Sequence, residues 1–245
     1  MKTLGLIGGM SWESTVPYYR IINETVRESL GGHHSAPLVL YSVDFHDIEA
    51  LQQAGDWEAM GERLGEIARR LEGAGVDVLV LCTNTMHRVA PAIEAAAPDI
   101  PLLHIADATA AAARDQGIRR VGLLGTRFTM EGAFYRGRLE DQHDLEVLVP
   151  DASGREAVHR TIYDELVHGD VREASRERFQ AIIADLDSRG AEAVILGCTE
   201  ISMLVGPQDA DLPLLDTMEV HAQAAARACL GDEEESRPSG LSSSI

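Results

Sequence analysis

Two segments of the sequence each end an apolar run at a small nucleophilic side chain. The first reads GAGVDVLVLCT at residues 73–83, and the second reads SRGAEAVILGC at residues 188–198. Aligned without a gap, they place Thr83 opposite Cys198, 115 residues further along the chain. A buried strand that ends in a hydroxyl or a thiol, once in each half, predicts two chemical groups that face one substrate.

Cys82 lies one position outside this register. Neighbouring residues of a strand point to opposite faces, so we expect that only one of Cys82 and Thr83 faces a cleft, and the repeat favours Thr83. Cys82 is then either the last core residue of its strand or a second thiol of the site. Thr83 itself has an alternative role as a helix N-cap.

Cys198 is followed by Thr199 and Glu200, where a helix is expected to begin. A helix N-terminus stabilises a thiolate, so we expect the pKa of the Cys198 thiol to lie below its ordinary value of about 8.5. The alternative is a buried structural cysteine. The adjoining Gly197, the Thr-Glu pair and the repeat favour a chemical role.

The loop at residues 8–15, GGMSWEST, leads from an expected strand into an expected helix. Its backbone N–H groups could bind an anion, although the glycines do not match a dinucleotide fingerprint. His87 lies one helical turn after Asn84 and is a candidate neighbour of the site. The other histidines show no metal-binding spacing such as HExxH, so we expect no metal.

The composition excludes several classes of protein. A net charge of −19 argues against nucleic acid and against an anionic membrane surface as partners. Lys2 is the single lysine, which disfavours a pyridoxal phosphate Schiff base, and no P-loop occurs. The three cysteines have no zinc-like spacing and fit a reducing cytosol, so we expect a cytoplasmic protein. Neither a signal peptide nor a membrane span is predicted.

Short Val/Leu/Ile runs alternate with helical patterns along the chain, which predicts an α/β fold with mostly parallel sheets. The expected strands are 3–8, 37–43, 76–82, 101–104, 119–124, 145–149, 191–197 and 212–215. The expected helices are 14–29, 57–74, 86–97, 107–116, 130–142, 154–168, 172–189 and 218–230.

The internal repeat extends beyond the two strand ends. LGLIGG at residues 4–9 resembles VGLLGT at 121–126, and PLL occurs at both 101–103 and 213–215. Three matches in the same order predict two similar α/β halves with a ligand site between them, at the carboxyl ends of the strands. The charged and Ser/Gly/Pro-rich residues 231–245 are predicted to form a disordered tail.

The motifs GLIGGMSWEST at 5–15, CTNTMH at 82–87 and GCTE at 197–200 resemble those of the aspartate/glutamate racemase family, which needs no cofactor. The resemblance implies two pseudo-symmetric α/β domains, formed by 1–104 plus 217–230 and by 105–216, with the active site in the cleft between them. It also implies a homodimer whose small-molecule substrate is an amino acid.

Thr83 occupies the position where the family usually has a cysteine, which agrees with the internal repeat. The chain therefore resembles the subgroup with broad specificity or with L-aspartate/glutamate specificity, in which Thr83 and Cys198 would be the catalytic pair. The family's substrate contacts correspond to Met10, Gln52, Asn84, Thr85, Thr199 and Glu200, and the accessory candidates are Cys82, Ser11, His87 and Thr126. Many aspartate racemases carry a lysine near 163–169; its absence here argues against strict aspartate specificity.

These residues predict a proton transfer at the α-carbon of an amino acid, in which one group removes the proton from one face and the other delivers a proton to the opposite face. Two other classes remain open at this stage. One is a related cysteine-dependent decarboxylase or maleate-type cis–trans isomerase, because the fold alone does not determine the reaction. The other is a non-catalytic small-molecule binding protein, because Thr83 replaces the usual cysteine.

Overall fold

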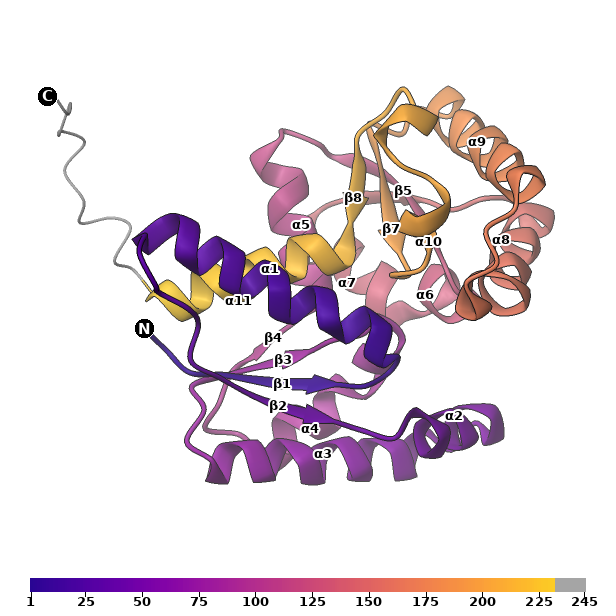
Figure 1. Cartoon of the computed structure of the whole chain (residues 1–245). Coiled ribbons are helices and arrows are strands. Elements are labelled where there is room, and N and C mark those ends of the chain that lie inside the picture. The colour runs from indigo at the N-terminus through magenta and orange to yellow at the C-terminus, as the bar shows by residue number, and fades with distance from the viewer. Residues whose placement is uncertain (232–245) are drawn as a thin grey trace, which may run out of the picture.

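The computed structural model describes residues 1–231. Residues 232–245 of the predicted tail lie outside the described residues. Two parallel four-stranded sheets form the framework (Figure 1). The first has the order β2-β1-β3-β4 and the second the order β6-β5-β7-β8. The strands are β1 Leu4–Gly8, β2 Leu38–Ser42, β3 Val78–Leu81, β4 Leu102–Leu103, β5 Arg120–Gly125, β6 Glu146–Leu148, β7 Ala193–Gly197 and β8 Leu214–Asp216. The α/β fold and the parallel sheets predicted from the sequence are confirmed.

The strand register explains why the repeated motifs lie at equivalent places. In the first sheet Ile7 is paired with Leu81, so the loop after β1 lies beside the residues that follow β3. In the second sheet Gly125 is paired with Gly197, which puts Thr126 beside Cys198. Because parallel strands end at the same sheet edge, each sheet presents two polar loops side by side.

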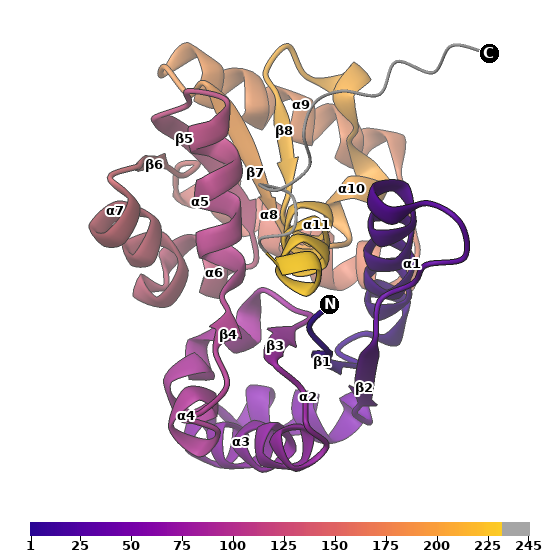
Figure 2. The ribbon, with the colours of Figure 1, turned by 90° about the vertical axis from the view of Figure 1, so that its left-hand side faces the viewer.

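Helices cover both faces of each sheet, and the two halves are stacked with α11 between them (Figure 2). The longer helices are α1 Trp12–Leu30, α2 Phe45–Ala54, α3 Trp57–Gly73, α5 Ile105–Asp115, α8 Ala152–Asp164, α9 Glu173–Ser188 and α11 Thr217–Leu230. The last of these follows β8 of the second sheet but lies against α1 of the first half. The shorter helices are α4 Ala90–Ala96, α6 Arg127–Glu131, α7 Arg138–His143 and α10 Ile201–Leu204.

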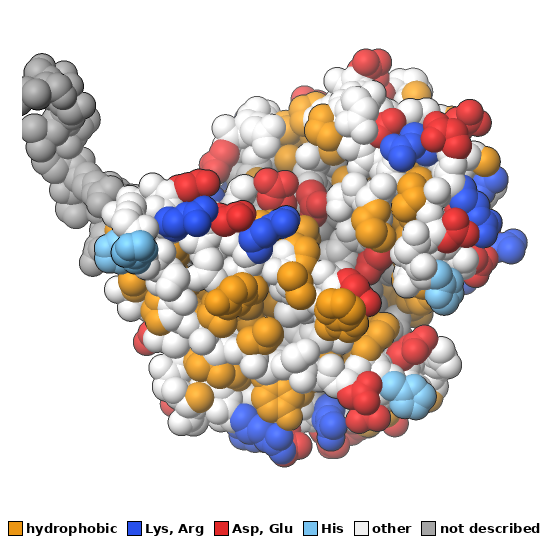
Figure 3. All heavy atoms as spheres, in the orientation of Figure 1, with side chains coloured by type: hydrophobic (Ala, Val, Ile, Leu, Met, Phe, Trp, Pro, Cys, Tyr) orange, Lys and Arg blue, Asp and Glu red, His pale blue; other side chains and the backbone are white. Residues whose placement is uncertain are grey.

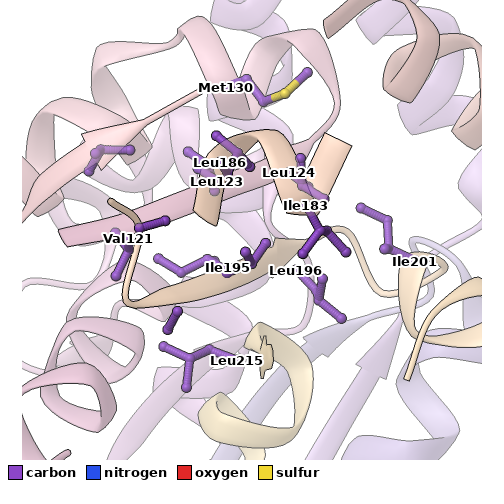
Figure 4. Packing of buried hydrophobic residues seen from close by; sticks show 14 of the residues in the cluster. Val121, Leu123, Leu124, Met130, Ile183, Leu186, Ile195, Leu196, Ile201 and Leu215 are labelled. Carbon is purple, nitrogen blue, oxygen red and sulfur yellow. The ribbon is translucent and has the colours of Figure 1, made fainter. Parts of the chain in front are cut away.

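Alternating residues of the strands fill separate core clusters on the two faces of the first sheet. Leu6, Val80 and Cys82 pack with α1 and α11, whereas Ile7 and Leu81 pack with α3 and α4. In the second half one continuous cluster surrounds β5 and β7, with Leu123, Leu124, Ile195 and Leu196 near its centre (Figure 4). Burial of this kind contributes about 25 cal/mol per Å² of apolar surface. Both sheets therefore hold their polar strand ends on a rigid base.

Three helix predictions differ from the structure. The expected helix 86–97 begins as a 3₁₀ segment at Thr85–Val89, and α4 starts afresh at Ala90 with Pro91 in its first turn, a place suited to proline. The expected helix 130–142 is divided into α6, a π segment at Ala133–Gly137 and α7, because Gly132 has an extended backbone. The expected helix 154–168 ends at Asp164 and is followed by a 3₁₀ segment at Leu166–His168.

Helix α2 was absent from the predicted elements. Its ends nevertheless carry ordinary signals: Asp44 accepts a hydrogen bond from the His46 N–H, and Gly55 adopts the left-handed conformation of a helix C-cap. Ile48 is its single buried residue, so the apolar period that marks longer helices is too weak here. This helix supplies Gln52, one of the predicted substrate contacts.

Candidate active site

Side chains from the first loop and from the end of β7 form one polar cluster. The Ser14 hydroxyl lies 2.8 Å from the Thr199 hydroxyl and donates to the Glu200 carboxylate at 3.3 Å. The Thr199 hydroxyl also donates to Glu200, at 2.8 Å. These contacts join residues about 185 positions apart and bring the two halves together at the predicted cleft. Thr199 and Glu200 were predicted for the site, and Ser14 was not.

Cys198 is partly exposed, and its thiol donates to the Glu200 carboxylate at 2.9 Å. Burial, followed by the negative charge of Glu200 and its hydrogen bond with the thiol, raises the pKa of Cys198 well above its ordinary value. The prediction of a lowered pKa is therefore wrong. The following helix, α10, begins at Ile201 and has a single turn, too short and too distant for its dipole to outweigh the carboxylate.

Thr83 is half-buried, and its hydroxyl makes no hydrogen bond within residues 1–231, so it remains available to a ligand. Its carbonyl group accepts from Nδ1 of His87 at 2.7 Å, while Nε2 of His87 accepts from the Ile105 N–H at 3.2 Å. These partners require the neutral tautomer with the proton on Nδ1. Burial and the neighbouring His104 and His221 lower the pKa of His87, which keeps that tautomer uncharged. His87 thus positions the backbone of Thr83.

The Asn84 side chain links the end of β3 to the second half. Its Nδ2 donates to the Thr217 hydroxyl at 2.9 Å, and that hydroxyl donates to the Leu196 carbonyl group at 2.8 Å. Because the hydroxyl proton is committed to Leu196, the amide nitrogen of Asn84 must face Thr217. The Asn84 oxygen is then left without a partner, although the residue is 5% exposed. A buried acceptor of this kind suits a donor group on a ligand.

The remaining predicted residues lie around these groups. Met10 is buried in the same core cluster as Met86, and Ser11 caps α1. Thr85 is half-buried at the start of the 3₁₀ segment, and Thr126 caps α6. Cys82 is 0% exposed, its thiol lies 3.8 Å from the Val80 carbonyl oxygen, and its side chain packs in the core with α1 and α11. This placement agrees with the interpretation of Cys82 as the last core residue of its strand.

Gln52 reaches the other half of the chain through a hydrogen bond that its Nε2 donates to the Tyr163 hydroxyl, at 3.1 Å. Tyr163, Thr217 and Ser14 were all missed in the sequence. Ser14 lies in the loop that was predicted to bind an anion, and Thr217 follows Asp216, which caps α11. Both therefore had a local signal. Tyr163 lies inside a helical pattern and had none.

Replacing Glu200 by glutamine is expected to lower the pKa of the Cys198 thiol, because the variant keeps the side-chain shape and removes the negative charge that favours the protonated thiol. The pH at which iodoacetamide reacts half-maximally with Cys198, followed by peptide mass spectrometry, should then shift downward. The Glu200→Gln, Cys198→Ala double variant is the control for the labelled site. An unchanged or higher midpoint would show that burial alone determines the thiol pKa.

No helix within 1–231 is both long enough and apolar enough to span a bilayer. In the same part of the chain, no three or more His, Cys, Asp or Glu side chains are grouped as a metal site would require.

Known proteins resemble this chain over most of its length. A solved structure of a candidate Asp/Glu racemase from Yersinia pestis is 56% identical, with a TM-score of 0.91, covering 94% of this chain and 100% of that one. A glutamate racemase from Thermus thermophilus is 33% identical over 75% of this chain and 68% of its own length. A broad-specificity amino-acid racemase from Bacillus subtilis is 22% identical over 87% of this chain and 92% of its own. The sequence pattern of the Asp/Glu/hydantoin racemase family matches residues 7–225, and the chain belongs to this family.

Proposed function

We propose that this chain racemises an amino acid without a cofactor, with Thr83 and Cys198 as the two groups that exchange the α-proton on opposite faces of the substrate. The observation that carries the proposal is the equivalent placement of Thr83 and Cys198. Thr83 follows β3, which pairs with β1, and Cys198 follows β7, which pairs with β5. The two sheets have the same strand order. Two groups are needed because a single base tends to return the proton to the face from which it was taken.

The polar groups around this pair match the ends of an amino acid. The unpartnered acceptor oxygen of Asn84 suits the α-ammonium group. Backbone N–H groups in the turns at Thr83–Asn84 and Cys198–Thr199 are suited to the α-carboxylate, whose negative charge grows as the α-proton leaves. Stabilising this charge is essential, because an α-proton of an amino acid is weakly acidic.

The two groups are chemically unequal. Even with its raised pKa, the Cys198 thiol gives up its proton more readily than a threonine hydroxyl does, so turnover numbers in the two directions are expected to differ. Enantiomers have equal free energies in water, so the equilibrium constant remains 1. Any difference in kcat must therefore be balanced by a matching difference in KM.

Deuterium incorporation at the α-carbon tests the proposal. The purified chain is incubated in D₂O with a panel of L- and D-amino acids and no added cofactor, and the products are analysed by mass spectrometry and chiral chromatography. We expect solvent deuterium to enter together with inversion. Failure to exchange any amino acid, combined with turnover of maleate or of an arylmalonate, would assign the site to a different reaction.

We also propose that residues 1–104 plus 217–230 and residues 105–216 act as two domains on either side of the site. The bond between Gln52 and Tyr163 joins the two units, and the bond between Asn84 and Thr217 holds the start of α11 against the rest of the first unit. All three cysteines are free thiols, which supports a reducing, cytoplasmic location.

A homodimer is proposed from an apolar face on the first half. Trp12, Val16 and Tyr19 follow one stripe of α1 and are 64%, 57% and 54% exposed, and Val39 and Leu40 are exposed on the edge strand β2. Apolar side chains gather on this face of the molecule (Figure 3). An apolar patch beside an open sheet edge suits a second copy related by a two-fold axis.

Val16→Glu is expected to dissociate this dimer, because the change places a charge in the middle of the apolar stripe. Sedimentation velocity should show the mass of two chains for the wild type and of one chain for the variant. Val171→Glu, at an exposed apolar residue of the other half, is the matched control and should stay dimeric. A monomeric wild type would contradict the assignment of this face.

A further inference from the structure

The geometry points to a substrate whose side chain is uncharged and able to form hydrogen bonds, with Tyr163 and Gln52 as the residues that determine this preference over a second carboxylate. The inference rests on the proposed racemase function and specifies its substrate class. Gln52 on α2 of the first half and Tyr163 on α8 of the second half contact each other between the halves.

The Tyr163–Gln52 pair offers one donor and one acceptor. The Gln52 amide nitrogen donates to the Tyr163 oxygen at 3.1 Å, so the phenol proton of Tyr163 is not used in this bond. The Gln52 amide oxygen likewise has no partner within the described residues. A hydroxyl or carboxamide side chain can both accept from Tyr163 and donate to Gln52. A carboxylate can only accept, and it would meet the Gln52 oxygen without a proton to share.

Tyr163 lies close to the catalytic thiol and to acidic groups. Burial raises the pKa of Tyr163, the hydrogen bond from Gln52 lowers it, and the neighbouring acidic groups Cys198, Glu49 and Glu200 raise it, so these groups lie within electrostatic reach of the phenol. The substrate's own α-carboxylate adds another negative charge to the same cleft. A further carboxylate at this end would be repelled, because like charges in a partly buried site destabilise one another.

Several arginines of α6, of α8 and of the segment before α9 already have partners. Arg127 is paired with Glu156, Arg160 with Asp164, and Arg172 with Asp170 and Glu165. The guanidinium group of Arg88 lies 4.1 Å from the centre of the Trp57 ring. The chain's single lysine, Lys2, is exposed at the opposite end of β1. Arg127, Arg160 and Arg172 are thus engaged with carboxylates of the chain itself.

An aromatic series holds Tyr163 in position. Its ring centre lies 4.8 Å from that of His159, which lies 6.5 Å from Phe128, and Phe128 lies 5.7 Å from Trp57 of the first half. Burial and the charge of Arg127 lower the pKa of His159, so this imidazole adds no positive charge at neutral pH. The series therefore provides an oriented but uncharged wall.

The test compares substrates of equal shape and different charge. We expect kcat/KM for asparagine to exceed that for aspartate by a factor of about ten or more, and the same order for glutamine over glutamate. Tyr163→Phe should reduce the advantage of asparagine over aspartate, mainly through KM. Tyr163→Lys should shift the ratio toward aspartate, and Gln52→Lys provides a second route to the same reversal if the first variant does not fold.

Two controls keep the outcomes distinct. Tyr41→Phe removes an exposed phenol that bonds to Arg70 and should leave every ratio unchanged. Arg88→Gln should also leave the asparagine-to-aspartate ratio unchanged. If the wild type has an equal or higher kcat/KM for aspartate than for asparagine, the inference is overturned and the racemase function is left intact. Loss of activity on aspartate in Arg88→Gln would overturn the inference in the same way. Absence of α-proton exchange with every amino acid would instead refute the proposed function.

Discussion

Cys198→Ala is expected to lower racemisation of both enantiomers by a factor of about 10²–10⁴, which corresponds to roughly 3–5 kcal/mol of lost transition-state stabilisation. Each turnover requires one proton transfer on each face of the α-carbon, so loss of one group stops both directions. The thiol occupies a position that no other thiol can reach, because Cys82 and Cys229 are both buried in the core between the first sheet and its two covering helices.

Chiral chromatography of reactions started from each enantiomer provides the measurement. Cys82→Ala is the matched control, since it also removes one thiol but from the core, and it should affect thermal stability more than the rate. Full racemase activity in Cys198→Ala would eliminate the two-group scheme. Loss of activity in Cys82→Ala with native stability would show that the register of the repeat had been assigned to the wrong residue.

The fold was largely predictable because its main signal is local. Each apolar strand is recognisable by itself, and the repeat between residues 73–83 and 188–198 indicated two similar α/β halves, whose sheets have the same strand order in the structure. Strand alternation predicted that Cys82 and Thr83 would not both face the cleft, and the register of the repeat favoured Thr83. The structure shows the basis of that alternation, since Val80 and Cys82 pack on one face of the sheet while Leu81 packs on the other.

The electrostatics of the site could not be predicted in the same way. Glu200 lies two residues from Cys198, and the sequence does not show that its carboxylate turns back toward the thiol; the expectation of a stabilised thiolate failed for that reason. The contacts of Gln52 with Tyr163 and of Asn84 with Thr217 span 111 and 133 residues. Such contacts depend on how the halves are placed, which no local pattern records.

Thr83→Ala is expected to abolish inversion while α-proton exchange continues for one enantiomer. The variant loses the group on one face and keeps Cys198 on the other, so the enantiomer whose α-hydrogen faces Cys198 can still lose and regain a proton there. The Cys198 thiol is partly exposed and hydrogen-bonded to Glu200, so the thiol proton can exchange with solvent. In D₂O the product should therefore carry deuterium with its original configuration, a result that general misfolding would not produce.

Two further substitutions at this position separate the hydroxyl from its surroundings. Thr83→Ser keeps the hydroxyl and should retain most of the inversion. Thr83→Cys places a stronger proton-transfer group at this position, where the bond from His87 to the carbonyl group of residue 83 holds the backbone. The variant should raise kcat for the direction that is slower in the wild type. If Thr83→Ala inverts its substrate at the wild-type rate, the second proton comes from another group or from water, and the equivalence of Thr83 and Cys198 is confined to the fold.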